Sequence, residues 1–212
     1  FGLTDLTGRV ALDVGASTGG FTDCLLQHGA ARVWAVDTGR GQLHERLRQD
    51  PRVRLREQAN ARELTPDWLD GERVDCIAVD VSFISLRLIL PRLAAVLAPD
   101  GWVLVLVKPQ FEAGPQDVGR GGVVRDRRVH RRVLEETIAF AAGDGWDVRG
   151  LCPSPIPGPA GNVEFFLWLV RRPPDDASSG AAVSGLPIEP ILDEAYNLLT
   201  AQSPTRRDAA PS

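Results

Sequence analysis

Three charged side chains interrupt stretches of the sequence that are otherwise apolar. They are Asp80 in the run Val-Asp-Val-Ser-Phe, Lys108 in Val-Lys-Pro-Gln-Phe and Glu164 in Asn-Val-Glu-Phe. An unpaired charge in such surroundings is costly, so each side chain needs a partner or a chemical task. One interpretation is a structural salt bridge. The other is catalysis, because a lysine held by carboxylates can align a hydroxyl and either accept or polarise its proton.

Lys108 is the only lysine among 24 basic residues, and all the others are arginine. GC-rich coding accounts for most of that bias, but it leaves the single lysine to be explained. A guanidinium stays protonated in proteins, whereas a buried amine can lose its proton and act as a base. The exception therefore favours a task for Lys108 that arginine cannot perform.

A glycine-containing turn, Asp-Val-Gly-Ala-Ser-Thr-Gly-Gly, occupies residues 13–20. Its glycines allow the backbone to approach a ligand closely, but the spacing is not GxGxxG, which argues against a dinucleotide. Asp37 ends the next apolar run, where a carboxylate can accept both hydroxyls of a ribose. The pair predicts S-adenosylmethionine, a nucleoside ligand without a pyrophosphate. The turn alone could instead serve only tight packing, and Asn60 could either reach the adenine or cap a turn.

Strands and helices alternate along the chain and predict the elements that position these residues. Apolar runs with few interruptions are typical of buried parallel strands, and apolar residues at helical spacing lie between them. We expect strands at 9–14, 32–37, 53–57, 74–81, 101–107, 146–152 and 162–170, and helices at 20–28, 42–49, 85–97 and 126–142. Asp126 is the expected N-cap of the last of these helices, after a glycine-containing loop over 109–124.

This order predicts an α/β fold, a Rossmann-like, doubly wound, mostly parallel seven-stranded sheet with an antiparallel closing strand. Ligands of such sheets bind beyond the carboxyl ends of the strands, where Asp37, Asp80 and Lys108 are expected. We expect a catalytic domain over 1–172, a flexible linker over 173–187, and an amphipathic helix with a disordered tail over 188–212.

Composition excludes several classes of protein. A net charge of −4 provides no general attraction to nucleic acid, so an RNA substrate would need a local basic surface. Three scattered cysteines without a CxxC motif indicate a reduced compartment and no metal site. Neither a membrane-spanning run nor a signal pattern is visible, which predicts a cytoplasmic location and no membrane partner. The chain begins with Phe1 and lacks methionine, which suggests that a front part has been removed.

Several motifs together resemble one family. Residues 13–23, Asp37 with the following Gly-Arg-Gly-Gln-Leu, residues 80–86, residues 107–112 and residues 158–164 look like the TlyA family, which is similar to the FtsJ-type ribose methyltransferases. The similarity runs in order from about Gly8 to Arg171. The resemblance implies 2′-O-methylation of cytidines in both ribosomal RNAs by a Lys-Asp-Lys-Glu tetrad, with ribosomal RNA or ribosomal subunits as partners and no protein partner evident.

The resemblance also assigns roles to residues. The last three tetrad members match the predicted catalytic residues Asp80, Lys108 and Glu164. The first lysine and a small RNA-binding domain lie upstream in the family and before Phe1 here, and Arg40 stands where the family commonly has an aromatic residue. With S-adenosylmethionine as cofactor, the predicted cofactor-binding residues are Asp13, Gly15, Ser17, Gly19, Gly20, Phe21, Asp37, Asn60 and Asp80.

Two other functions remain open at this point: a nicotinamide-dependent oxidoreductase, and a membrane-active protein, since the family has carried a haemolysin label. A glycine-rich loop over 114–122 could act as a lid. Six arginines follow the strand expected at 101–107 and could contact RNA phosphates or form a solvated helix face. They are Arg120, Arg125, Arg127, Arg128, Arg131 and Arg132.

Overall fold

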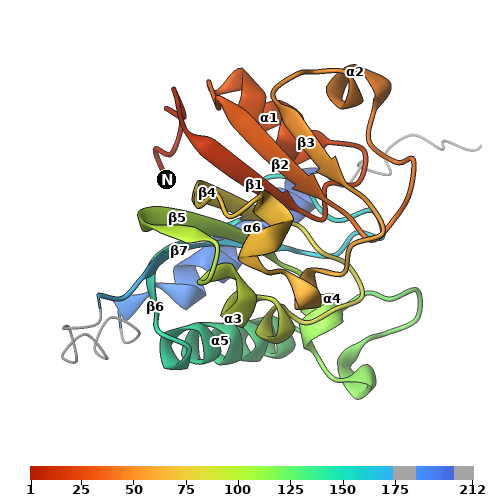
Figure 1. Ribbon diagram of the computed structural model, residues 1–212. Coiled ribbons are helices and arrows are strands. Elements are labelled where there is room, and N and C mark those ends of the chain that lie inside the picture. Colours follow the sequence, from red (N-terminus) through yellow and green to blue (C-terminus); the bar gives the residue numbers. More distant parts are fainter. Residues whose placement is uncertain (174–184, 203–212) are drawn as a thin grey trace, which may run out of the picture.

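The computed structural model describes residues 1–173 and 185–202 and contains one seven-stranded sheet (Figure 1). The strand order is β3-β2-β1-β4-β5-β7-β6, and β7 runs antiparallel to both of its neighbours. The predicted fold is therefore confirmed, including the antiparallel closing strand. The strands are β1 (Val10–Val14), β2 (Arg32–Val36), β3 (Val53–Arg56), β4 (Val74–Val79), β5 (Leu97–Val107), β6 (Trp146–Pro153) and β7 (Phe165–Arg171).

Helices cover both faces of the sheet. One face packs against α3 (Leu90–Leu93), α5 (Arg127–Gly143) and α6 (Ile188–Gln202), and the other packs against α1 (Gly20–Gln27) and α2 (Glu45–Arg48). The α4 helix (Pro109–Glu112) follows β5 directly. Short 3₁₀ turns complete the chain: η1 (Ala61–Glu63), η2 (Pro66–Leu69), η3 (Leu86–Leu88) and η4 (Pro115–Asp117). None of the helices within the described ranges is both long and apolar enough to cross a membrane.

The expected helix over 85–97 is wrong in its extent. That segment forms η3 and then the single turn of α3, because Pro91 lacks an amide hydrogen and cannot continue a helix begun at residue 86. The last residue of the expected helix, Leu97, instead begins β5, where it pairs with Val74. The expected helix over 42–49 is likewise reduced to α2, whose N-cap is the His44 side chain.

Two further boundaries differ near the predicted site. The closing strand begins at Phe165, so Glu164 precedes β7 instead of lying within it. The expected loop over 109–124 contains α4, η4 and a Gly119–Val123 bridge, so it is largely ordered. Asp126 caps α5 as expected, since its side chain accepts a hydrogen bond from the Arg128 amide at 2.8 Å.

The C-terminal helix expected after residue 188 is present as α6, and it buries Leu192 and Ala195 against the sheet and α5. Residues 174–184, which make up most of the expected linker, lie outside the described residues. So does the expected tail over 203–212. The proposed division into domain, linker and tail therefore stays a prediction.

The turn after β1 requires a glycine for two reasons. Gly15 has a φ of +88°, and a Cβ atom there would overlap the carbonyl oxygen of Asp80. The backbone of β1 and the chain leaving β4 therefore touch where the two strands end. Only a residue without a side chain allows this approach, which sets the position of Asp80.

We predict that Gly15→Ala lowers the free energy of unfolding by about 2 kcal/mol or more, because it adds both backbone strain and a steric overlap. Gly20→Ala is the matched control. Gly20 begins α1 at negative φ with open space around its Cβ position, so alanine should be neutral or stabilise by up to about 1 kcal/mol. Urea unfolding of both variants measures the difference, and equal stabilities would contradict the prediction.

Candidate active site

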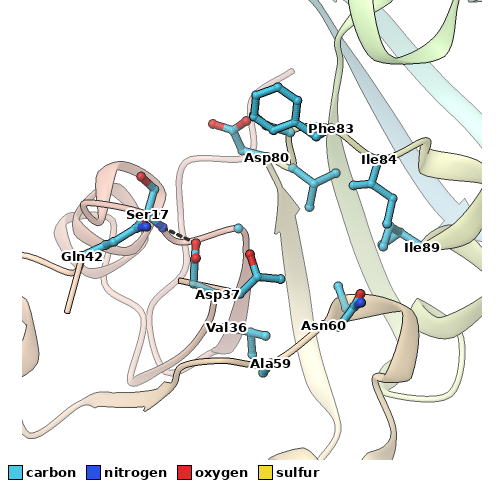
Figure 2. Close-up of a pocket in the computed structure, with 15 residues that line it drawn as sticks. Ser17, Val36, Asp37, Gln42, Ala59, Asn60, Asp80, Phe83, Ile84 and Ile89 are labelled. Atoms are coloured by element: carbon cyan, nitrogen blue, oxygen red, sulfur yellow. Dashed lines mark hydrogen bonds between the residues drawn. The ribbon is translucent and has the colours of Figure 1, made fainter. Parts of the chain in front are cut away.

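A cleft opens at the carboxyl ends of β1, β2 and β4, where ligands bind in sheets of this type. The turn after β1 contributes Gly15 and Ser17, and the segment after β2 contributes Asp37. Asn60 and Asp80 line the cleft from further along the chain, together with apolar residues such as Ile84 (Figure 2). Five of the nine predicted cofactor-binding residues are therefore brought to one cavity by four separate segments.

Asp37 holds the glycine turn in place. One oxygen of its carboxylate accepts the Ser17 amide at 2.8 Å, the dashed line in Figure 2, and the other accepts the Gly39 amide at 2.6 Å. A carboxylate oxygen can accept more than one hydrogen bond, so both remain able to receive hydroxyls from a ligand. Ser17 itself adopts a left-handed φ of +47°, which turns its amide toward Asp37.

The structure shows Asn60 in one of the two roles considered from the sequence, the cap, and its contact with an adenine stays a prediction. Its side chain caps η1 by accepting the Arg62 amide at 3.2 Å, and it also lines the cleft. The cap fixes the orientation of the amide group, so the two roles are compatible.

The other four predicted cofactor residues lie outside the lining of this cleft. Gly19 has a φ of +105° at the start of α1, where it packs against Leu43 and Leu47, and Gly20 follows it. Phe21 lies against Phe166, with ring centroids 6.2 Å apart, and lines a separate apolar cavity. Asp13 is fully buried behind the turn. Their predicted roles in cofactor binding are untested by this geometry.

Lys108 and Asp80 form an ion pair at the end of the central strands. The Lys108 Nζ lies 2.6 Å from the Asp80 Oδ1 and donates a hydrogen bond to the Ser82 Oγ at 3.1 Å. The lysine side chain is only 13% exposed and that of Asp80 is 32% exposed. A charge pair with this little water around it is strongly coupled, and the contact to Ser82 fixes where the amine points.

Glu164 lies at the same edge of the sheet, immediately before the antiparallel strand β7. Because β7 is antiparallel to β5 and pairs Phe165 with Val107, the residue before β7 lies beside the residue after β5. The Gln110 amide donates to the Glu164 Oε1 at 2.9 Å. Burial raises the pKa of Glu164, while the hydrogen bond from Gln110 and the charge of Lys108 lower it. Asp80, Lys108 and Glu164 are thus brought to one edge of the sheet, and their catalytic roles stay a prediction.

Three residues at this site were missed from the sequence. Ser82 and Gln110 contact Lys108 and Glu164 directly, and both stand two residues after a predicted catalytic residue. Phe83 is 90% exposed and adopts a left-handed φ of +63°, and its ring centroid lies 4.9 Å from that of Phe111. An exposed aromatic in a strained conformation is typical of a binding residue, but only the structure shows the exposure and the strain.

Asp13 is a buried carboxyl group close to both Asp37 and Asp80. One of its oxygens accepts a hydrogen bond from the Thr22 hydroxyl at 2.6 Å, and the other has no hydrogen-bond partner among the residues described. The pKa of Asp13 is raised to about 7, chiefly by burial; the hydrogen bonds from Thr22 lower it, and the negative charges of Asp80 and Asp37 add to the increase. Within ranges 1–173 and 185–202 there is no cluster of His, Cys, Asp and Glu suited to a metal ion.

Comparison with known proteins identifies close relatives. A family model described as FtsJ-like methyltransferase matches residues 1–171. The chain is 51% identical over 164 residues to the 16S/23S rRNA (cytidine-2′-O)-methyltransferase TlyA of Mycobacterium tuberculosis (strain ATCC 25618 / H37Rv), which covers 77% of this chain and 61% of that protein. It is 46% identical to the protein YqxC of Bacillus subtilis (strain 168), over 90% of this chain and 67% of that protein.

A solved structure of similar sequence has the same fold. It is a Streptococcus thermophilus protein labelled as a hemolysin, 43% identical, with a TM-score of 0.83 over 93% of this chain and 70% of that chain. The chain therefore spans about two thirds or less of the length of the curated relatives described above.

The position of Asp13 predicts a specific dependence of stability on pH. Its pKa is about 7 in the folded state and 3.8 in the reference state, so between these values the folded state holds a proton that the unfolded state has released. The resulting stabilisation is complete below about pH 4 and is lost as the pH rises through about 7. One pKa unit corresponds to about 1.4 kcal/mol, so the expected slope is about 1 kcal/mol per pH unit.

Asp13→Asn removes the titrating group but keeps an oxygen for the Thr22 hydroxyl, and the exposed Asp100→Asn is the control. Urea unfolding of the ligand-free protein from pH 4.5 to 7.5 should show a flatter slope for Asp13→Asn than for the wild type and the control. Parallel curves for all three proteins would show that Asp13 is ionised throughout.

Proposed function

The chain belongs to the FtsJ-like methyltransferase family, and from that premise we propose that it transfers the methyl group of S-adenosylmethionine to the 2′-hydroxyl of cytidine in ribosomal RNA. The observation that carries the proposal is the Lys108–Asp80 ion pair, 2.6 Å long, which joins the cofactor cleft to Glu164 at the acceptor end. The relative that bears this activity in its name is 51% identical, and its identity supports the choice of cytidine.

The residues of the cleft fit S-adenosylmethionine. Asp37 offers two carboxylate oxygens to ribose hydroxyls, Asn60 is assigned to the adenine, and Gly15 lines the cleft with backbone alone. The carboxylates of Asp37 and Asp80 complement a positively charged ligand, while a dinucleotide would bring the negative charge of a pyrophosphate. This arrangement disfavours the nicotinamide-dependent alternative. The bound cofactor would supply an electrophilic methyl group on a sulfonium.

The acceptor end has the groups that a hydroxyl needs in order to react. Lys108 acts on the 2′-hydroxyl, either by accepting its proton at Nζ or by donating a hydrogen bond to its oxygen. Asp80 and Ser82 hold the amine at 2.6 and 3.1 Å and limit its rotation. Glu164, itself fixed by Gln110, orients the lysine or the ribose. In-line alignment of the hydroxyl with the methyl group follows from holding both ligands at one sheet edge.

The first prediction of this proposal concerns the acceptor atom. Incubation with S-adenosylmethionine and unmodified ribosomal RNA or subunits should yield 2′-O-methylcytidine after digestion to nucleosides. Transcripts made with 2′-deoxycytidine should give no product, and transcripts made with 2′-deoxyuridine should remain substrates. Methyl transfer to the deoxycytidine transcripts would place the methyl group on a base or on the ribose of another nucleotide, and either outcome would refute the proposal.

The second prediction concerns Lys108. Lys108→Arg keeps the positive charge opposite Asp80 but removes a group able to accept a proton. If Lys108 is the base, single-turnover methyl transfer should slow by a factor of about 10² or more. The affinity for S-adenosylmethionine should change little, because Lys108 does not line the cleft.

Lys108→Ala serves as the reference for loss of the whole side chain. Full turnover by Lys108→Arg together with loss in Lys108→Ala would show that Lys108 only polarises the hydroxyl. Full turnover by both variants would remove Lys108 from the mechanism.

A further inference from the structure

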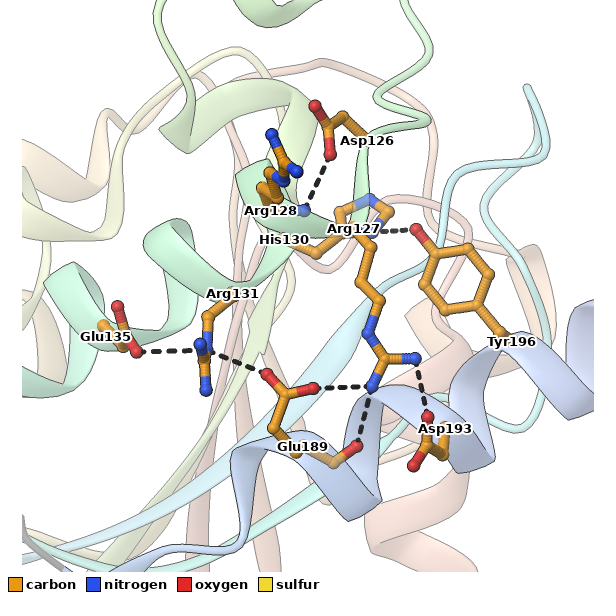
Figure 3. A network of polar contacts seen from close by, with 9 residues as sticks. All are labelled: Asp126, Arg127, Arg128, His130, Arg131, Glu135, Glu189, Asp193 and Tyr196. Atoms are coloured by element: carbon orange, nitrogen blue, oxygen red, sulfur yellow. Dashed lines mark hydrogen bonds and ion pairs between the residues drawn. The ribbon is translucent and has the colours of Figure 1, made fainter.

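The structure divides the six arginines that follow β5 into two groups. Three of them are neutralised by acidic side chains. Arg127 pairs with Glu189 at 2.7 Å and with Asp193 at 2.6 Å, and Arg131 pairs with Glu189 at 2.8 Å (Figure 3). Arg132 pairs with Asp117 at 2.6 Å.

The other three, Arg120, Arg125 and Arg128, have exposed side chains. Each of them lies beyond ion-pair distance of every carboxylate in residues 1–173 and 185–202. Figure 3 shows the Arg128 side chain pointing away from α6, whereas Arg127 and Arg131 point toward it. We call these three residues the arginine patch.

The backbone that carries the arginine patch is fixed. The Gly119 amide donates to the Val123 carbonyl at 3.0 Å, which closes a small hairpin around Arg120. The buried Asn162 side chain holds the hairpin at two points, accepting the Val124 amide at 3.0 Å and donating to the Gly122 carbonyl at 2.9 Å. The Tyr196 hydroxyl donates to the Arg125 carbonyl at 3.2 Å.

These contacts also locate the patch beside the acceptor end. Asn162 precedes Glu164 by two residues, so the hairpin is tied to the segment that carries the catalytic carboxylate. On its other side the hairpin is connected through η4 to α4, which begins directly after Lys108. Figure 1 shows this green segment projecting past α4.

The charges near the patch leave it positive. Asp117 is already paired with Arg132, and Asp126, whose side chain caps α5 through the Arg128 amide, offsets only one of the three positive charges. Exposed guanidinium groups without carboxylate partners suit phosphates, which their planar fork can bind through two hydrogen bonds. Since the chain as a whole carries a net charge of −4, attraction to RNA needs a local surface of this kind.

We propose that Arg120, Arg125 and Arg128 bind backbone phosphates of the RNA beside the nucleotide that is methylated. This inference rests on the proposed function and adds the surface by which the catalytic domain holds its substrate. Phosphate contacts of this kind fix the register of a nucleic acid without reading its sequence. Because Asn162 holds the hairpin and lies two residues before Glu164, RNA bound to the patch would have a fixed position relative to Glu164.

The test compares two triple variants that remove the same charge. Arg120→Gln/Arg125→Gln/Arg128→Gln deletes the patch, and Arg54→Gln/Arg92→Gln/Arg149→Gln deletes three exposed arginines on β3, α3 and β6. Affinity for ribosomal RNA is measured from 50 to 200 mM salt, together with methyl transfer and affinity for S-adenosylmethionine.

The logarithm of the RNA-binding constant falls linearly with the logarithm of the salt concentration, and each lost phosphate contact makes this fall shallower by about 0.7 to 0.9. The slope of the patch variant should therefore be smaller in magnitude by about 2 to 3, and that of the control variant by less than about 1. Methyl transfer by the patch variant should show a raised KM for RNA at nearly unchanged kcat, and its affinity for S-adenosylmethionine should equal that of the wild type. Equal slopes for the patch and control variants, with a wild type that binds and methylates RNA, would overturn the patch alone. A wild type that neither binds nor methylates RNA would overturn the proposed function and the patch with it.

Discussion

The ion pair between Lys108 and Asp80 is the constraint on which the arrangement of the site depends. Two charges with little solvent around them stabilise the fold only if the geometry is good, so the backbone at both strand ends must be held accurately. The Asp80 amide donates a hydrogen bond to the Val14 carbonyl at 2.9 Å, and the Asp80 carbonyl packs against the backbone of Gly15. These two contacts fix the backbone of Asp80. Lys108 is held by the last residues of β5, which are fully buried or nearly so. The pair therefore joins the cofactor turn to the acceptor end through the backbone.

Three carboxyl groups lie in or behind the cleft and determine which charge a ligand should carry. Burial is the main reason that the pKa of Asp13 is raised to about 7, and the charges of Asp80 and Asp37 lie close enough to add to that increase. Of these three carboxyl groups, Asp80 is the one that forms an ion pair with a basic side chain among the described residues. A ligand with a positive charge would relieve the repulsion among the three carboxyl groups, whereas an anionic ligand would increase it. The composition of the cleft thus favours the sulfonium cofactor on physical grounds that are independent of the glycine pattern.

The fold and most of the site could be predicted because they depend on local patterns. Apolar runs gave the strands, and the order of the strands placed Asp37, Asp80 and Lys108 at one edge. The errors came from tertiary contacts that override local spacing. Leu97 fits a helical repeat, yet Pro91 separates η3 from α3 and Leu97 pairs with Val74 in β5. Glu164 follows an apolar residue and reads as strand, but the bond from Gln110 and the loop before β7 set its place. The exposure of Phe83 leaves no mark on the sequence at all.

The C-terminal helix shows how a distant segment determines which arginines stay available. The sequence identified α6 as amphipathic but could not say what its polar face contacts. Its apolar side buries Leu192 and Ala195, which supplies most of the packing energy, because exposed ion pairs contribute little individually. Its acidic side chains, Glu189 and Asp193, form ion pairs with Arg127 and Arg131 near the start of α5. Since consecutive helical residues point in different directions, Arg128 is left facing away from α6. The docking of α6 therefore separates structural arginines from those exposed beside the acceptor end.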